Sequence, residues 1–115
     1  MKIFIMDSRI IFEKSEYLKL KVIWPKISDS EWIYFGAGKD VNFDVVLRQF
    51  EIHLSTEALF ISFNRINSFE TNINMAKVTL EHLIGKENFI AWNDSFTKAI
   101  EFNNIGVLRC GQIPA

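Results

Sequence analysis

The chain has 115 residues, of which 49% are hydrophobic and 23% are charged, and its formal net charge is −1. This length and composition predict one globular domain over residues 1–115 with a substantial core, and they exclude an intrinsically disordered chain. The charge excludes a strongly basic nucleic-acid-binding protein, because neutralising phosphates requires an excess of Lys and Arg.

The first third of the chain has the pattern of short β-strands. Residues 2–6 are predicted to form a strand that turns back into 9–12. Residues 18–24 alternate between apolar side chains and lysines or Ile, which predicts a strand with one wet face. A further strand is expected over 31–35, and the glycine-rich residues 36–38 end it.

Residues 42–54 fit two structures. A helix over this segment has one apolar face, and Asn42 would cap its first turn. The segment also alternates from Phe50 to Leu54, which is typical of a strand that forms a hairpin with 58–63. We favour the helix and keep the hairpin as the alternative. Residues 58–63 are a strand in both interpretations.

The second half combines one clear helix with further strands. Residues 73–84 form the helix, with Asn72 or Asn74 as its N-cap and Gly85 at its C-terminal cap. Residues 88–92 are predicted to be a strand.

The segment after Asn93 begins either a short helix up to Ile100 or one arm of a hairpin, and residues 105–110 form a last strand. Many strands with one or two helices, in no regular βαβ alternation, predict an α+β fold: a mostly antiparallel sheet packed with those helices.

No catalytic or metal-binding motif is apparent in the sequence. His53 and His82 have no ligand partner at the usual spacing, so we expect no metal and no cofactor. Cys110 lies in an apolar strand and is interpreted as a buried structural thiol. Arg48, Glu51 and His53 are the clustered polar residues that a catalytic site would use.

The single cysteine also bears on where the protein works. Without a second cysteine no internal disulfide forms, which suits a reducing compartment. The apolar residues 2–6 are too short for the core of a signal peptide, and no apolar run reaches transmembrane length. We therefore expect a cytoplasmic protein that does not enter a membrane.

Phenylalanine accounts for eleven of the sixteen aromatic residues. Phe4, Phe43, Phe50 and Phe89 fit the inward-facing apolar pattern. Four others lie at strand ends, in loops or in ambiguous segments and are candidate surface anchors. These are Phe35, Phe69, Phe96 and Phe102.

Acidic residues are concentrated in the middle of the chain, where residues 28–70 carry a net charge of −4. A surface of this kind would steer a basic partner. The acidic residues of this segment are Asp29, Glu31, Asp40, Asp44, Glu51, Glu57 and Glu70.

The C-terminal part carries a family resemblance. Residues 89–93, 100–102 and 105–109 resemble the end of small bacterial immunity proteins that are paired with contact-dependent growth inhibition toxins. This resemblance implies tight binding of a cognate toxin C-terminal domain, whose active site is thereby blocked. It carries over no binding residue by position.

Two functional hypotheses follow. In the first, the protein is an immunity protein whose acidic surface meets the basic cleft of a nuclease toxin, with an aromatic residue as a buried anchor. Its candidate toxin-binding residues are Asp29, Glu31, Trp32, Tyr34, Asp40 and Asp44. The alternative is a small α+β enzyme or ligand-binding domain with a Phe-lined pocket. The first hypothesis makes the protein a binder and not an enzyme.

Overall fold

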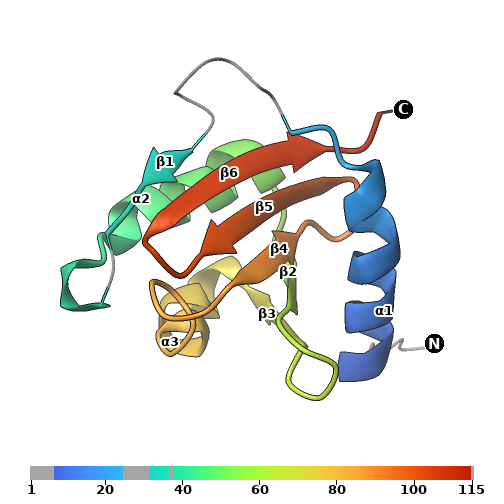
Figure 1. Cartoon of the computed structure of the whole chain (residues 1–115), viewed down its shortest axis with the longest axis horizontal. Helices are drawn as coiled ribbons and strands as arrows, with labels where there is room; N and C mark the ends of the chain where they lie inside the picture. The colour runs from blue at the N-terminus through green and yellow to red at the C-terminus, as the bar shows by residue number, and fades with distance from the viewer. Residues whose placement is uncertain (1–6, 25–31, 37, 115) are drawn as a thin grey trace.

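In the part of the chain that the structure describes, six antiparallel strands form one sheet in the order β1-β6-β5-β4-β2-β3 (Figure 1). The computed structural model describes residues 7–24, 32–36 and 38–114. The strands are β1 (Ile33–Tyr34), β2 (Ala58–Ser62), β3 (Phe69–Asn72), β4 (Phe89–Trp92), β5 (Lys98–Asn103) and β6 (Val107–Gln112). Together with three α-helices they confirm the α+β prediction. The strand expected over 2–6 lies outside the described residues.

The first described element is a helix, α1 (Ser8–Leu18), which continues as a 3₁₀ turn through Lys21. Asp7 caps it, because its side chain accepts a hydrogen bond of 2.9 Å from the Ile10 amide. The strands predicted over 9–12 and 18–24 are therefore wrong. The alternating residues 18–24 do not form a strand of the sheet. Within this segment only Ile23 pairs with β6, through one isolated bridge to Gln112.

The helical interpretation of 42–54 is confirmed. Helix α2 (Phe43–Gln49) begins after Asn42, whose side chain accepts from the Asp44 amide at 3.1 Å. A π-helical turn (Phe50–Leu54) follows it. Phe50 and Leu54 are buried there, so the alternation that suggested a strand reflects two core positions on one helical face.

The predicted helix over 73–84 is present but shorter. A 3₁₀ turn (Ile73–Met75) leads into α3 (Ala76–Leu80), and Asn72 is the cap, accepting from the Met75 amide at 2.9 Å. Turns then lead to Gly85, which has the predicted left-handed conformation at φ +75°.

The ambiguous segment after residue 93 is a hairpin arm. Asn93 begins the turn between β4 and β5, and Phe96 lies in this turn at φ +55°. Positive φ is uncommon for a bulky side chain. Here it directs the ring inward, where it stacks on Phe60 and Trp92.

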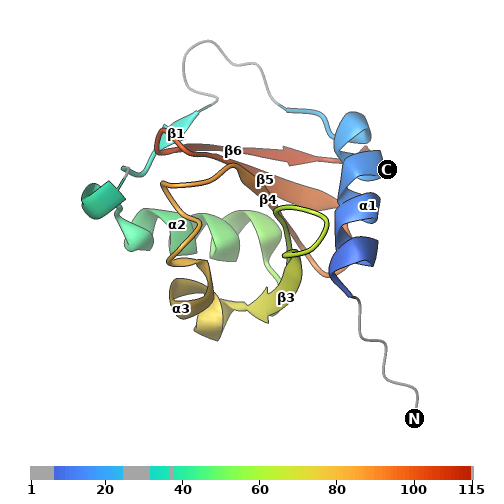
Figure 2. The same ribbon diagram turned by 60° about the horizontal axis from the view of Figure 1, so that its bottom comes forward.

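The two faces of the sheet bury separate cores. One core lies between the sheet and α2, the π-helical turn and α3. The other lies beneath α1, where the Trp92 indole donates a 2.8 Å hydrogen bond to the Ser15 hydroxyl. Figure 2 shows α2 and α3 on one side of the sheet and α1 across one end of the other.

The expectation that certain phenylalanines are surface anchors is wrong for three of the four. Phe35, Phe96 and Phe102 are each at most 2% exposed. Phe35 and Phe102 pack edge to face in the core, with ring centroids 5.8 Å apart. Phe69 is half-buried and packs against the same core.

Candidate functional site

Part of one sheet face has no described helix over it. Helix α1 packs against β2 and β4, while β5, β6 and β1 extend beyond it (Figures 1 and 2). Because side chains alternate along a strand, the residues of β5 and β6 that lie between core positions point to this face. Glu101 of β5 lies opposite Arg109 of β6, and Val107 lies opposite Tyr34 of β1.

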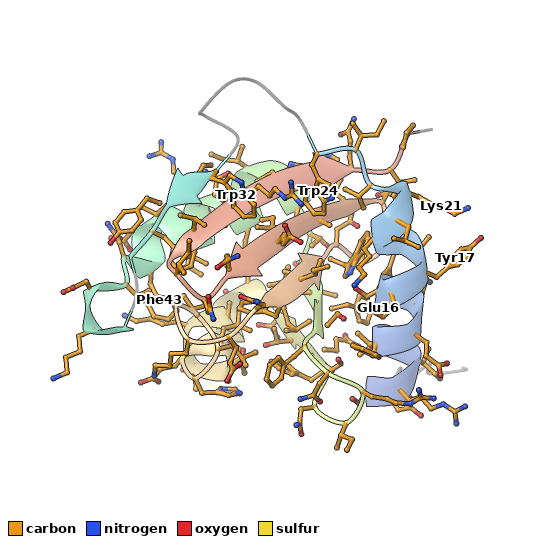
Figure 3. All side chains as sticks on the ribbon, viewed as in Figure 1. Glu16, Tyr17, Lys21, Trp24, Trp32 and Phe43 are labelled. Atoms are coloured by element: carbon orange, nitrogen blue, oxygen red, sulfur yellow. The ribbon has the colours of Figure 1, made fainter. Side chains whose placement is uncertain are left out.

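The centre of this surface is a stacked arginine. The Arg109 guanidinium carbon lies 4.6 Å from the Trp24 ring and 4.8 Å from the Trp32 ring. Its Nε donates a 2.6 Å hydrogen bond to Glu101. Each cation–π contact contributes about 0.5–2 kcal/mol. Figure 3 shows both tryptophans on this face of the sheet. We call Trp24, Arg109, Trp32 and Glu101 the arginine stack.

Gly111 makes the arginine stack geometrically possible. A Cβ atom at this position would lie 2.6 Å from both the Trp24 ring and the Val22 side chain. The segment that carries these residues therefore lies directly on β6. Two backbone hydrogen bonds between Ile23 and Gln112, of 2.8 and 3.3 Å, hold it there.

A hollow of about 320 Å³ lies beside the arginine stack. Trp32 and Glu101 form part of its lining, and Glu16 and Lys19 of α1, joined by an ion pair of 2.8 Å, line it as well. Ser62 also lines it, is 5% exposed, and its hydroxyl has no hydrogen-bond partner among the described residues. The hollow thus presents carboxylate and hydroxyl oxygens beside an aromatic ring, which suits contacts with a polar side chain of another molecule.

The sequence-predicted binding residues that the structure describes lie in neighbouring segments. Tyr34 on β1 is 69% exposed and Trp32 is half-buried. Asp40 and Asp44 are exposed, and their segments lie at the same end of the molecule as β1 (Figure 1). Asp29 and Glu31 lie outside the described residues.

Close backbone contacts hold this end together. Gly36 has φ +95°, and a Cβ atom there would collide with the Asp40 carbonyl oxygen. The Asn42 amide then donates a 2.7 Å hydrogen bond to the Phe35 carbonyl. The chain therefore folds back onto the end of β1 between these residues, which brings Asp40 close to that strand.

The residues of the enzymatic alternative do not meet in one cavity. Arg48 and Glu51 are exposed, whereas His53 Nε2 donates a 2.8 Å hydrogen bond to the Gly111 carbonyl. A hollow of about 310 Å³ next to His53 is also lined by Cys110, but by neither Arg48 nor Glu51. Among the described residues, no three His, Cys, Asp or Glu side chains are grouped so as to hold a metal ion.

Cys110 is held as a thiol. Cys110 is half-buried instead of fully buried, and this partial burial disfavours the thiolate and raises the pKa of Cys110 to about 11. Its Sγ lies 3.6 Å from the Gln49 side-chain oxygen and donates to it. A thiol with this pKa is almost fully protonated near neutral pH, so the geometry favours the predicted structural role over a nucleophilic one.

Sequence reasoning missed the arginine stack. Glu101 and Arg109 each alternate with core residues in their own strands, and this period does mark them as side chains of the second face. Their pairing depends on the register between β5 and β6, which cannot be derived from the sequence pattern. Trp32 was a candidate binding residue, but only the fold places it and Trp24 beside the same guanidinium.

In the described part of the chain, no helix has the length and apolarity that crossing a membrane requires. Comparison with known proteins identifies no relative: no family model matches the chain, and neither a curated protein nor a solved structure matches it.

Proposed function

We propose that this protein is an immunity protein that binds a cognate bacterial toxin domain and occludes its active site. The observation that supports this best is an exposed aromatic residue, Tyr34, on the strand next to the arginine stack. Trp, Tyr and Arg side chains dominate the binding energy of protein interfaces. A rigid arginine held between two tryptophans is also pre-organised, so little side-chain entropy is lost when a partner covers it.

The acidic residues at the same end supply the electrostatic part of the proposal. Asp40 and Asp44 are exposed. A nuclease toxin carries a basic cleft for its nucleic acid, and carboxylates that face this cleft would speed encounter and compete with the substrate for the same surface. Binding is then stoichiometric occlusion with no chemical step.

The first experiment identifies the partner. The C-terminal domain encoded by the gene immediately upstream is expressed with and without this protein, and cell survival and co-purification are measured. The proposal expects rescue of growth and a one-to-one complex. It fails if that domain is not toxic, or if toxicity persists although the two proteins are both present.

The second experiment locates the interface. Tyr34→Ala is expected to weaken toxin binding by at least about tenfold, as truncation of a central interface aromatic does. Tyr17→Ala is the matched control, because Tyr17 is 63% exposed but lies on α1 (Figure 3). Equal effects of the two substitutions would place the interface elsewhere.

The electrostatic part has its own test. The double variant Asp40→Asn with Asp44→Asn is expected to lower the association rate by about three- to tenfold at low salt and to reduce its salt dependence. Glu87→Gln with Asp94→Asn removes the same charge from two other exposed residues. If both double variants associate equally fast, the steering role of Asp40 and Asp44 is wrong.

A further inference from the structure

The strand β3 is one edge of the sheet, and within the described residues it pairs with β2 alone. The Ile73 amide donates a 3.2 Å hydrogen bond to the Glu57 carbonyl. Bonded and non-bonded pairs alternate along an antiparallel ladder, so Thr71 and Phe69 also point their backbone groups towards β2. The N–H and C=O groups of Glu70 and the N–H of Asn72 therefore point outwards, away from the sheet, whereas the Asn72 carbonyl begins the 3₁₀ turn.

One end of this edge is already closed. Ser68 is the next residue in the outward-pointing series, and its amide donates a 2.8 Å hydrogen bond to the Ser8 hydroxyl at the start of α1. That hydroxyl in turn donates to the Arg65 carbonyl at 2.8 Å. The available edge is thus confined to Phe69–Asn72, which sets the length of any strand that can add to it.

Two hollows lie beside this edge, one with acidic side chains in its lining and one with exposed apolar side chains. A hollow of about 480 Å³ at the start of β2 is lined by Glu57 and Glu70 and by no cationic side chain among the described residues. A second hollow, of about 570 Å³, is lined by Phe69 of β3, by Val78 of α3 and by His82, which follows α3. Val78 is 67% exposed, although it is apolar.

We propose that β3 accepts an extended segment of a partner protein as a seventh strand of the sheet. The outward groups of Glu70 and Asn72 would supply the main-chain hydrogen bonds of such a strand addition. A Lys or Arg of the added strand lies against Glu57 and Glu70, and an apolar side chain enters the hollow at Phe69 and Val78. Successive side chains of a strand point to opposite faces, so the partner sequence alternates cationic and apolar residues.

Charge selects this partner over a second copy of the same chain. Two β3 strands paired about a twofold axis through their outward-pointing residues would place the Glu70 carboxylates of both copies on the same face of the strand pair. Like charges placed across a strand pair destabilise it, and exposed charges on edge strands commonly prevent self-association. A partner strand with Lys or Arg opposite Glu70 replaces this repulsion with an attraction between opposite charges.

The test uses a cyclic hairpin peptide whose free strand alternates Lys and Val. Titrated into the ¹⁵N-labelled protein, it is expected to shift the Glu70 and Asn72 amides first. A control peptide with Glu in place of Lys is expected to bind at least about tenfold more weakly, since each added repulsion opposes the pairing. Failure of the Lys peptide to shift these two amides at millimolar concentration would overturn the proposal.

Glu70→Pro separates strand addition from simple charge attraction. The Glu70 N–H points outwards, so proline removes a donor from the free edge and none from the ladder with β2. Affinity for the Lys peptide is expected to fall by at least about tenfold, whereas Asp94→Asn, in the β4–β5 turn, leaves it unchanged. If Glu70→Pro does not fold, Glu70→Lys tests the charge contribution and is expected to weaken binding of the Lys peptide, while the shifts of the Glu70 and Asn72 amides in the wild type remain the readout for strand addition.

Unchanged binding by a folded Glu70 variant would refute the proposal. A wild-type dimer in sedimentation that Glu70→Lys dissociates would also refute it, in favour of self-pairing. The edge does not depend on the toxin hypothesis, because β3 and β1 lie at opposite ends of the order of described strands. Tyr34→Ala is therefore expected to leave peptide binding unchanged.

Discussion

The hydrogen bond that joins α1 to the sheet allows a quantitative prediction. The Trp92 indole and Ser15 are both fully buried, and the 2.8 Å bond between them links residues 77 positions apart. Ser15→Ala leaves the indole N–H without its partner inside the core, which costs about 1–3 kcal/mol. Alanine returns up to about 0.5 kcal/mol through its higher helix propensity. We therefore expect the free energy of unfolding to fall by about 1–2 kcal/mol.

A double-mutant cycle distinguishes this bond from packing. Urea unfolding is followed by circular dichroism for the wild type, Ser15→Ala, Trp92→Phe and the double variant. Phenylalanine removes the donor, so Ser15→Ala in that background is expected to be neutral or slightly stabilising, and the coupling energy should reach about 1–2 kcal/mol. An equal loss of stability in both backgrounds would show that the hydrogen bond contributes nothing.

Three further predictions concern single residues. Gly111→Ala places a Cβ 2.6 Å from the Trp24 ring and should cost about 1–3 kcal/mol in urea unfolding; a neutral result would contradict the packing. Cys110, with its pKa raised to about 11, should react with a disulfide reagent at pH 8 about 100-fold more slowly in the folded than in the unfolded protein; equal rates would contradict its burial. Asn93→Ala should cost about 1–3 kcal/mol in thermal unfolding, because the buried side-chain oxygen accepts from the Thr97 and Lys98 amides, and an unchanged melting temperature would contradict this.

The sequence predicts those elements whose local pattern agrees with their surroundings. The strand β4 is a continuous apolar run, β2 is one from Ala58 to Ile61, and the sheet buries both strands on both faces. The start of α2 is likewise predictable, because Asn42 is both a favourable N-cap in isolation and the observed cap. In each case propensity, period and packing favour the same structure.

The errors arise where a local pattern has two physical solutions. Residues 8–18 form a helix because the Asp7 cap begins it and because Ile11 and Ser15, four residues apart, face the sheet together. The alternation that follows has no partner strand, so Leu20 is 82% exposed instead of buried. The strand β3 has no alternating apolar pattern, so its sequence does not predict a strand. It is a strand because it pairs with β2.

The sequence predicts some residues of the candidate site but not how they are arranged. Tyr34, Asp40 and Asp44 are exposed as a binding surface requires, and the acidic composition of their segment is evident from the sequence. The arginine stack instead needs the β5–β6 register, which places Glu101 opposite Arg109. Register depends on the whole sheet, and a slip of β6 by one residue would move Arg109 to the other face, away from Glu101.

A glycine with no chemistry of its own therefore shapes the proposed binding surface. Because Gly111 has no side chain, Val22 and Trp24 can pack directly on β6. The two hydrogen bonds between Ile23 and Gln112 hold their segment at this distance from the strand. Trp24 is thereby placed 4.6 Å from the guanidinium of Arg109. Because this arginine is two residues from the glycine on the same face of the strand, a side chain at position 111 would displace the ring that orders the arginine. The proposed function therefore predicts that Gly111→Ala weakens toxin binding and also lowers the stability of the fold.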